Sequence, residues 1–447
     1  MSNVAPARAA AFDILLAVER GTGHSDELLH QPNVERLSAP DRNLAMNLVM
    51  GTLRWQLALD ARITPLLAKP KAQLDPLVHI ALRLGAFQLL HLDRVPAYAA
   101  IGESVELAKS SGNRFAAGMV NAILRKIAAR SEEKVSVKTT NSETLSHTFA
   151  HPQWMVERWV KNFGLQPTQA ICEYNQQPAP LFVRLLAPDA ELALQNDGIE
   201  LAPSSFLSNV RRVVKGDVSA SSALRKGWIR IQDEGSQLVA ELAGNGHSIL
   251  DTCAAPGGKT AILAERNPEA TMTACDVSRR RLQQMQRLLN GFDQIQYVTV
   301  DVANRQWTPD FDLVLCDVPC SGTGTLARNP EIRHRLTEPD LKRQQKRQVD
   351  LVLSAMRAVK RDGRLLYSTC SLEPEENQAV LQECLRHSHF ELVRLEKEIP
   401  RLEDAGILHA EGVQRLRESA MADGCLRTLP GIHGCDGFFA ALLVRQH

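Results

Sequence analysis

The feature that most limits the fold of this chain is a regular alternation of short apolar runs and helical segments from Ser248 to the carboxyl terminus. Such alternation predicts a parallel β-sheet covered by helices on both faces, an α/β fold. The runs expected as strands are residues 249–250, 272–277, 295–300, 311–316, 365–368 and 438–444. Helices are expected after Gly258, over residues 278–289 and over residues 339–359.

The first 130 residues show a different pattern, with apolar residues spaced three and four apart and no strand-like alternation. This spacing predicts an all-helical domain over residues 1–130. Residues 131–150 are expected to be a linker, because residues 131–146 are rich in Ser, Thr, Lys and Glu. Helical pieces and short extended runs over residues 151–235 predict a small α+β insert, which leaves residues 236–447 for the α/β domain.

Composition excludes several classes of protein. With 447 residues and 44% hydrophobic content, the chain can form two or three packed domains. A net charge of +1 neither requires nor excludes a nucleic-acid partner. No apolar stretch approaches the roughly 18 residues of a membrane span, so we expect a cytoplasmic protein without membrane contact. The nine cysteines contain no Cys-x-x-Cys pair, which favours reduced thiols and argues against a metal site.

A glycine-rich turn after the first predicted strand is the expected cofactor site. Ligands of such sheets bind beyond the carboxyl ends of the strands, and the following helix offers free backbone amides. A Walker phosphate loop is the rival interpretation, but Cys253 stands where its first glycine is required. The residues expected around the cofactor are Cys253, Ala254, Ala255, Pro256, Gly257, Gly258 and Lys259.

Aspartates stand at the ends of four predicted strands. Asp276 lies 25 residues after Asp251, near the spacing at which a carboxylate binds the ribose hydroxyls of an adenosine-containing cofactor. Asp301 is expected at the adenine edge, and Asp317 ends the fourth strand. A single Asp at a strand end is more often a cap or turn residue. Four aspartates at corresponding positions of consecutive strands favour a binding site.

Two cysteines, Cys320 and Cys370, each follow a predicted strand and are expected at the cofactor edge of the sheet. A thiolate is required to methylate carbon 5 of a pyrimidine, because that carbon is a poor nucleophile until a thiol has added to carbon 6. The pattern therefore indicates a thiol-using methyltransferase, with Lys259 as a candidate cation to activate a thiol. The cysteines expected to be buried core residues are Cys172, Cys275, Cys316 and Cys384.

Three segments, residues 249–260, 317–324 and 367–372, closely resemble the Sun/Fmu family of RNA cytosine-C5 methyltransferases. Further landmarks match at residues 232–236, 328–331, 376–377 and 436–439, so that the resemblance covers the whole chain. The amino-terminal part, with residues 51–54 and 121–125, is similar to the NusB-type helical RNA-binding domain of the bacterial member that modifies small-subunit ribosomal RNA.

The resemblance implies a Rossmann-like class I methyltransferase domain with an antiparallel last strand and S-adenosylmethionine as cofactor. It implies Cys370 as nucleophile, Cys320 as the thiol that assists release of the product, and Asp317 as the group that hydrogen-bonds or protonates N3. The cofactor residues implied are Cys253 to Lys259, Asp276, Asp301 and Asp317. The implied substrate is an unpaired or flipped-out cytosine of 16S ribosomal RNA, bound by a monomer whose insert over residues 151–235 also contacts RNA.

Two alternatives stay open. The same chemistry on transfer RNA is disfavoured only by the NusB-like domain. A non-catalytic RNA-binding or antitermination factor is disfavoured by the two strand-end cysteines.

Two further segments have uncertain roles. Residues 328–361 contain ten Lys or Arg against four acids, which indicates either a solvated helix face or contact with RNA phosphates. Residues 399–425 match no landmark and are expected to form a mobile loop.

Overall fold

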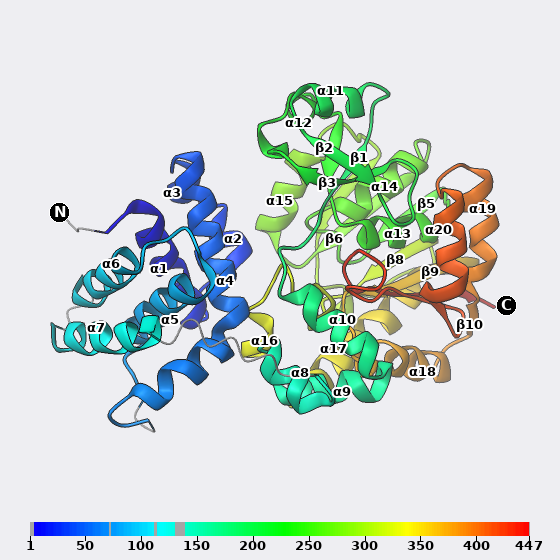
Figure 1. Cartoon of the computed structure of the whole chain (residues 1–447). Helices are drawn as coiled ribbons and strands as arrows, with labels where there is room; N and C mark the ends of the chain where they lie inside the picture. Colours follow the sequence, from blue (N-terminus) through cyan, green and yellow to red (C-terminus); the bar gives the residue numbers. More distant parts are fainter. Residues whose placement is uncertain (1–3, 71–72, 111–113, 130–138, 447) are drawn as a thin grey trace. The chain divides into compact units, whose positions relative to one another are not determined.

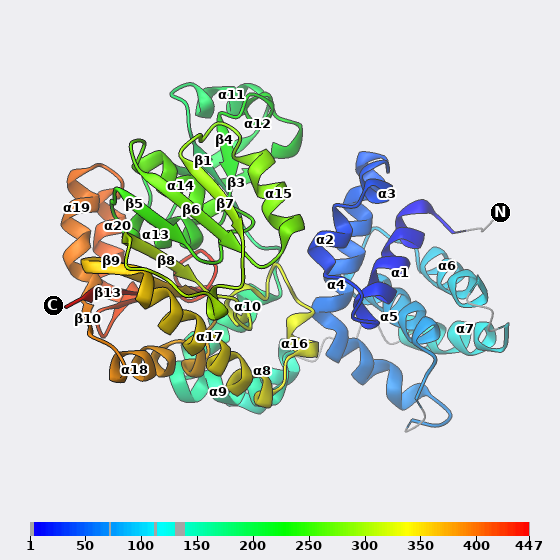
Figure 2. The same ribbon diagram turned by 180° about the vertical axis from the view of Figure 1, so that it is seen from behind.

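The computed structural model describes residues 4–70, 73–110, 114–129 and 139–446 (Figures 1 and 2). The chain forms two compact units. The first, which we call the helical unit, comprises Met1–Pro178 and Leu326–Arg335. The second, the sheet unit, comprises Ala179–Thr325 and Leu336–His447. None of the helices in the described ranges is both long and apolar enough to cross a membrane.

The helical unit contains no strand among its described residues, as the spacing of its apolar residues predicted. Its helices begin at sequence signals: Ser38 accepts a hydrogen bond from the Asp41 amide, Asp75 accepts one from the Leu77 amide, and proline stands in the first turn after both caps. One apolar core joins the first seven helices. The helices are α1 (Pro6–Glu19), α2 (Ser25–Leu29), α3 (Pro32–Glu35), α4 (Ala39–Ile63), α5 (Pro76–His91), α6 (Ala97–Ser110), α7 (Arg114–Ala129), α8 (Ser142–Thr148), α9 (Gln153–Phe163) and α10 (Leu165–Asn175).

The predicted linker is partly wrong. Residues 130–138 lie outside the described residues, but α8 occupies the second half of the segment. Asn141 and Thr144 form a capping box that begins this helix, and Leu145 is fully buried. Polar composition therefore concealed a helix whose start is specified by the same polar residues. Helices α9 and α10, expected with the insert, group with the helical unit.

A ten-residue segment from far along the chain, Leu326–Arg335, completes the helical unit. We call it the strap. It includes the short helix α16 (Ile332–Arg335), drawn in yellow beside α4 in Figures 1 and 2. The Glu331 carboxylate, 1% exposed, accepts hydrogen bonds from the Ser25 amide at 2.9 Å and the Ser25 hydroxyl at 2.8 Å. These bonds place a negative charge at the first turn of α2.

A buried arginine holds the same strap. Arg333 is 1% exposed and donates to the carbonyl oxygens of Arg54, Ala150 and Asn175 at 3.3–3.4 Å. Burial lowers the pKa of its guanidinium to about 9. Of the basic residues considered for RNA phosphate contact, Arg333 is therefore a structural residue, and that interpretation is wrong for this position.

The sheet unit is built on a sheet of order β11-β12-β13-β9-β8-β5-β6-β7, with β10 paired to β13. Strands β5 to β9 are parallel neighbours, and β13 runs antiparallel to β9. The predicted fold, a parallel sheet with an antiparallel last strand, is confirmed. The strands are β5 (Ser248–Asp251), β6 (Thr271–Asp276), β7 (Ile295–Thr299), β8 (Phe311–Asp317), β9 (Val359–Thr369), β10 (Phe390–Val393), β11 (Met421–Ala422), β12 (Cys425–Arg427) and β13 (Phe439–Arg445).

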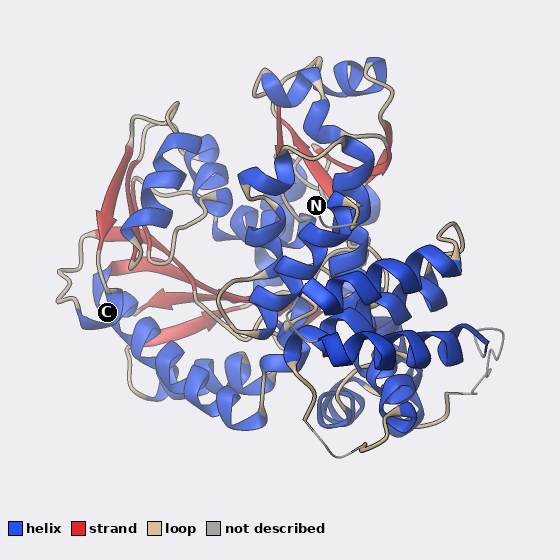
Figure 3. Ribbon diagram, turned by 90° about the vertical axis from the view of Figure 1, so that its left-hand side faces the viewer, coloured by secondary structure: helices blue, strands red, loops and turns tan. Residues whose placement is uncertain are grey.

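Helices cover both faces of this sheet (Figure 3). Side chains of β8 alternate between two cores: Leu313 and Leu315 pack with residues of α13 to α15, whereas Val314 and Cys316 pack with residues of α17 and α18. The apolar run is therefore buried on both sides, as a parallel strand requires. The helices are α13 (Glu234–Ala243), α14 (Gly258–Arg266), α15 (Arg279–Leu288), α17 (Glu338–Ala358) and α18 (Gln378–Arg386).

The prediction of a mobile loop over residues 399–425 is wrong. The segment forms α19 (Ile399–Asp404), α20 (Ala410–Arg415) and the short strand β11, and it reaches the start of β12. Ile399, Leu402 and Leu416 are fully buried in the main core. Each helix has only six residues, too few for a helical period to be read from the sequence, and burial rather than propensity stabilises them.

The small insert is a four-stranded antiparallel sheet of order β2-β3-β1-β4 with two helices. Phe182 and Val210 of this sheet join the core of the large sheet, so the insert packs on the α/β fold. The elements are β1 (Leu181–Leu185), α11 (Ala190–Asn196), β2 (Glu200–Pro203), β3 (Val210–Lys215), α12 (Ser222–Arg225) and β4 (Ile229–Ile231).

Replacing Glu331 by Gln should destabilise the helical unit. One carboxylate oxygen becomes an amide that faces a Ser25 donor, so we expect the free energy of unfolding to fall by about 1–3 kcal/mol. Urea unfolding of the full chain measures the change. Glu27→Gln, at an exposed position of the same helix α2, is the control and should stay within about 0.5 kcal/mol of the unmodified protein. Equal stabilities of the two variants would contradict the role assigned to the strap.

Candidate active site

A cavity of about 800 Å³ lies at the carboxyl edge of the parallel strands. We call it the Asp276 cavity. Because β5, β6, β8 and β9 are parallel, the residues that follow them meet at this edge. The predicted site residues in its lining are Cys253, Ala255, Asp276, Asp301, Asp317, Cys320 and Cys370.

Asp276 and Asp301 each have a local structural role as well as a place in this lining. Asp276 accepts a hydrogen bond from the Ser278 amide at 2.8 Å, which begins the turn into α15. Asp301 accepts bonds from the Ala303 amide at 3.2 Å and from the Asn304 side chain at 2.7 Å. Each aspartate can therefore fix its turn and also line the cavity, because a carboxylate oxygen that accepts one hydrogen bond retains a second lone pair.

The glycine-rich turn is shaped by the backbone conformation of one residue. Gly257 has φ = +105° and precedes the first residue of α14. A Cβ there would lie 2.7 Å from Cγ of Met285, so both the torsion and the space require glycine. The turn thereby directs the free amides of α14 toward the edge of the sheet.

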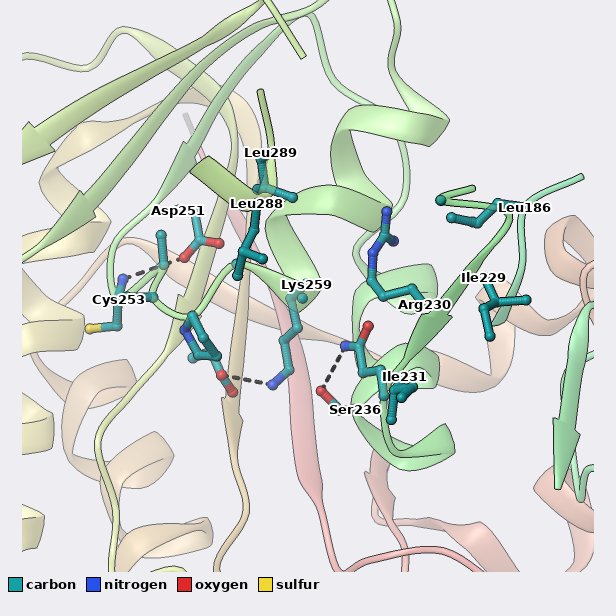
Figure 4. A pocket seen from close by; sticks show the side chains of 18 of the residues that line it. Leu186, Ile229, Arg230, Ile231, Ser236, Asp251, Cys253, Lys259, Leu288 and Leu289 are labelled. Carbon is teal, nitrogen blue, oxygen red and sulfur yellow. Dashed lines mark hydrogen bonds and ion pairs between the residues drawn. The ribbon is translucent and has the colours of Figure 1, made fainter. Parts of the chain in front are cut away.

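The turn borders a second cavity of about 560 Å³, which we call the Lys259 cavity. Figure 4 shows Lys259 between Leu288 and Leu289 on one side and Arg230 and Ile231 of the insert on the other. Of the predicted cofactor residues, the structure places Ala254, Pro256, Gly257, Gly258 and Lys259 here and not in the Asp276 cavity. The two cavities share Cys253, Ala255 and Asp317.

An ion pair stands at the shared wall. Lys259 Nζ lies 2.7 Å from Asp317 Oδ2, and Asp317 Oδ1 accepts a hydrogen bond from the Ser368 hydroxyl at 2.6 Å. Burial lowers the pKa of Lys259, but the negative charges of Asp317 and of a Cys370 thiolate outweigh burial and raise it. Lys259 is therefore a partly buried cation whose charge interacts with that of a Cys370 thiolate.

The two strand-end thiols are adjacent. Cys320 Sγ and Cys370 Sγ lie 3.3 Å apart, and both side chains are half-buried. The hydrogen bond to Cys370, burial and the negative charge of Cys370 raise the pKa of Cys320 well above its usual value. Cys320 therefore keeps its proton when Cys370 is a thiolate. The cysteines predicted to be core residues, Cys172, Cys275, Cys316 and Cys384, are fully buried, as expected.

A buried acid supports the turn. Asp251 ends β5 and accepts a hydrogen bond from the Thr260 hydroxyl at 2.7 Å. Burial raises the pKa of its carboxyl to about 7. The predicted series of four aspartates thus divides: Asp251 lines the Lys259 cavity, and the other three line the Asp276 cavity.

Sequence reasoning missed several residues of the site. Arg281 was not among the predicted site residues, yet its guanidinium donates to the Ala255 carbonyl at 2.5 Å and lies 3.7 Å from Asp276 Oδ2. Glu376 was noted only as a landmark and is fully buried beside the cysteine loops. Of the basic segment, Arg343, Lys346 and Arg347 line the Asp276 cavity. Their spacing of three and four residues places them on one face of α17, and this spacing was the signal in the sequence that could have identified them.

Comparison with family models identifies three matching regions. Residues 240–444 match the model described as 16S rRNA methyltransferase RsmB/F. Residues 5–129 match the NusB family, and residues 151–209 match the ferredoxin-like domain of RsmF/B-like methyltransferases.

Individual proteins are similar over nearly the whole chain. The chain is 31% identical to the probable ribosomal RNA small subunit methyltransferase B of Bacillus subtilis, with 97% of each chain covered. It is also 31% identical to ribosomal RNA small subunit methyltransferase B of Citrobacter koseri, with 98% of each covered. The solved structure of PH0851 shares the fold, with a TM-score of 0.78, 24% identity and 99% of each chain covered. A methyltransferase homologue from Pyrococcus horikoshii covers 69% of this chain and 100% of its own, with 25% identity and a TM-score of 0.55.

Replacing Asp251 by Asn should change how stability depends on pH. A carboxyl with a pKa raised to about 7 keeps its proton in the folded state while the unfolded chain loses it above about 4. The stability from this proton is complete below about pH 4 and is lost as pH rises to about 7. The free energy of unfolding of the variant, minus that of the unmodified protein, should therefore rise by about 1.4 kcal/mol per pH unit across this window and then level off.

Urea unfolding at a series of pH values measures this difference. Asp404→Asn, at an exposed position, is the control and should give a flat difference. A flat difference for Asp251→Asn as well would show that Asp251 is ionised in the folded protein.

Proposed function

The chain belongs to the RsmB/F family of 16S rRNA methyltransferases, and from this membership we propose that it methylates carbon 5 of a cytosine in small-subunit ribosomal RNA through a covalent cysteine adduct. The observation that carries the proposal is the pair of adjacent thiols, 3.3 Å apart, in a cavity that also contains Asp276 and Asp301. A methyltransferase that acts on an amine or a hydroxyl requires no thiol, whereas carbon 5 of a pyrimidine does.

The Asp276 cavity fits the cofactor S-adenosylmethionine. Its volume of about 800 Å³ lies within the range of small-molecule sites. Asp276 and Asp301 supply acceptors for ribose hydroxyls and an adenine amine. When bound, S-adenosylmethionine supplies an electrophilic methyl group. The chain's own residues must do everything else: orient the base, activate it and remove its proton.

In the proposed reaction, the Cys370 thiolate adds to carbon 6 of the cytosine and opens the double bond between carbons 5 and 6. The electron pair moves through the ring to N3, which takes a proton from the Lys259–Asp317 pair, and carbon 5 becomes nucleophilic and accepts the methyl group. A base then removes the proton on carbon 5, the double bond between carbons 5 and 6 re-forms as the Cys370 sulfur leaves as a thiolate, and N3 returns its proton to the Lys259–Asp317 pair. The Lys259–Asp317 ion pair supports this order, because it holds a proton at the wall of the cavity that Cys370 also lines.

Cys320 is proposed to assist the last phase. Its raised pKa keeps it as a thiol beside the Cys370 sulfur, so it can donate a hydrogen bond to the departing thiolate.

Several observations support ribosomal RNA as substrate. The names of the relatives in Bacillus and Citrobacter, and the NusB-family match over residues 5–129, favour it over transfer RNA. Arg343, Lys346 and Arg347 beside the cavity favour a polyanion. Because a paired base is shielded by its stack, the target cytosine is proposed to be unpaired or flipped out. We also propose that the protein acts as a cytoplasmic monomer.

The covalent step is tested with two cysteine variants. Cys370→Ala removes the nucleophile and should lower methyl transfer by at least about a thousandfold. Cys320→Ala should retain the attack and accumulate an RNA–protein adduct that survives denaturing electrophoresis. Cys172→Ala, at a buried thiol of the helical unit, is the control and should behave like the unmodified enzyme. An active Cys370→Ala enzyme would refute the mechanism.

The substrate is tested by direct comparison. Fragments of 16S ribosomal RNA should accept a methyl group at carbon 5 of cytosine, detected as 5-methylcytosine by mass spectrometry, and transfer RNA should accept at least about tenfold less. Preference for transfer RNA would favour the alternative substrate. Adduct formation without methyl transfer to either RNA would overturn the proposed activity.

A further inference from the structure

A fully buried carboxylate lies between the two cysteine loops. Glu376 follows β9, and its side chain accepts four hydrogen bonds. Oε1 accepts from the Ser321 amide at 2.8 Å and from Gln348 Nε2 at 2.9 Å. Oε2 accepts from the hydroxyls of Ser321 and Ser371, the latter at 2.5 Å. Ser321 directly follows Cys320, and Ser371 directly follows Cys370. One carboxylate therefore holds both loops.

Gln348 of α17 extends this arrangement. The same amide nitrogen that donates to Glu376 donates to the carbonyl of Pro319 at 3.0 Å, immediately before Cys320. The two serine hydroxyls also lie 3.1 Å from each other. We call Ser321, Gln348, Ser371 and Glu376 the clamp. Its hydrogen bonds hold Pro319 and Ser321, the residues directly before and after Cys320. They also hold Ser371, the residue directly after Cys370.

The backbone of the two loops is close enough for the clamp to act on the sulfur atoms. The Gly324 amide donates to the carbonyl of Cys370 at 2.9 Å, and a Cβ at Gly324 would overlap that oxygen. The loops are therefore in direct contact, and a small shift of either one changes the 3.3 Å separation of the sulfurs. Side-chain packing alone does not fix such a distance, because both cysteines are half-buried at the wall of a cavity.

A carboxylate is a costly group for this position. In the described part of the chain no Lys or Arg pairs with Glu376, and a buried carboxylate without a cation is offset only by its hydrogen bonds. Its two oxygens accept from four donors on three elements, which a neutral amide with one oxygen cannot do. The hydrogen bonds of Glu376 therefore fix the positions of the two loops, although burial of its charge lowers the stability of the fold.

We propose that Glu376 is a positioning residue that holds the Cys320 and Cys370 thiols at contact distance, so that Cys320 can assist departure of the Cys370 sulfur from the base. This role rests on the proposed function for the two thiols. The negative charge of Glu376 also contributes, after stronger causes, to the raised pKa of Cys320, and so helps to keep Cys320 protonated. Glu376 acts through the two loops and touches neither substrate nor cofactor.

The first test measures the distance between the thiols and needs no RNA. Diamide oxidises two adjacent thiols: each thiol gives up a proton and an electron, one S–S bond forms, and the azo group becomes a hydrazine. Mass spectrometry of the Cys320–Cys370 linked peptide gives the rate. Glu376→Ala should slow this cross-link by about tenfold or more, because small misplacement greatly lowers the rate of proximity-dependent reactions. Glu376→Gln, which keeps one acceptor oxygen, should recover part of the rate.

Two further variants make the result interpretable. Glu383→Gln changes a half-exposed carboxylate of α18 and should cross-link at the unmodified rate. If Glu376→Ala does not fold, as judged by its circular dichroism, the double variant Ser321→Ala/Ser371→Ala removes the two hydroxyl contacts and should slow the cross-link in the same direction. A folded Glu376→Ala or double variant that cross-links as fast as the unmodified protein overturns the proposal.

The second test measures catalysis in a single turnover. Glu376→Ala should slow release of the RNA adduct more than its formation, so that the adduct accumulates as in Cys320→Ala. Equal slowing of both steps would indicate a general structural role and would contradict positioning of Cys320. The failures are distinguishable: if the unmodified enzyme forms no adduct, the proposed function fails, whereas an unchanged cross-linking rate defeats only the role of Glu376.

Discussion

The parallel pairing of β5, β6, β8 and β9 is the constraint on which the rest of the site depends. Parallel strands end at the same edge, so residues separated by more than a hundred positions, such as Cys253 and Cys370, line one cavity without any direct sequence signal. The edge is also where backbone amides become free, because each strand gives way to a turn. Polar groups can therefore gather there although the strands themselves are apolar on both faces.

The sequence predicted what depends on local pattern and on strand order. Alternation identified the sheet, and the positions of Asp276 and Cys320 after strands predicted their shared edge, which the structure confirms. Long-range packing was beyond the same reasoning. The strap and its buried Arg333 are held by contacts with residues more than 150 positions away. Helix α19 is too short to show a helical period of apolar residues. The sequence predicted that Gly257 belongs to the cofactor turn. It did not predict that the residues of this turn would be divided between two cavities.

Polar residues repeatedly had two roles in this structure. Asp276 fixes a turn and lines a cavity, and Asn141 looked like linker composition but caps a helix. Composition does not separate these roles, because the same hydrogen-bonding capacity serves a backbone amide or a ligand. The role of such a residue depends on which element lies next to it in the fold. A single aspartate at a strand end is therefore a weak signal of a binding site, whereas aspartates at the ends of several neighbouring strands are a strong one.

The two thiols illustrate why proximity alone is insufficient for the proposed reaction. Nucleophilic attack requires one sulfur as a thiolate, and assisted release requires its neighbour as a thiol. Two thiols 3.3 Å apart lose their protons in two separate steps, and their surroundings decide which sulfur ionises first. Lys259 raises the local positive potential near Cys370, while the charge of Cys370 and that of Glu376 oppose ionisation of Cys320. In the proposed reaction, a partly buried cation on one side and a buried carboxylate on the other therefore distinguish the two thiols, one as the nucleophile and the other as a hydrogen-bond donor.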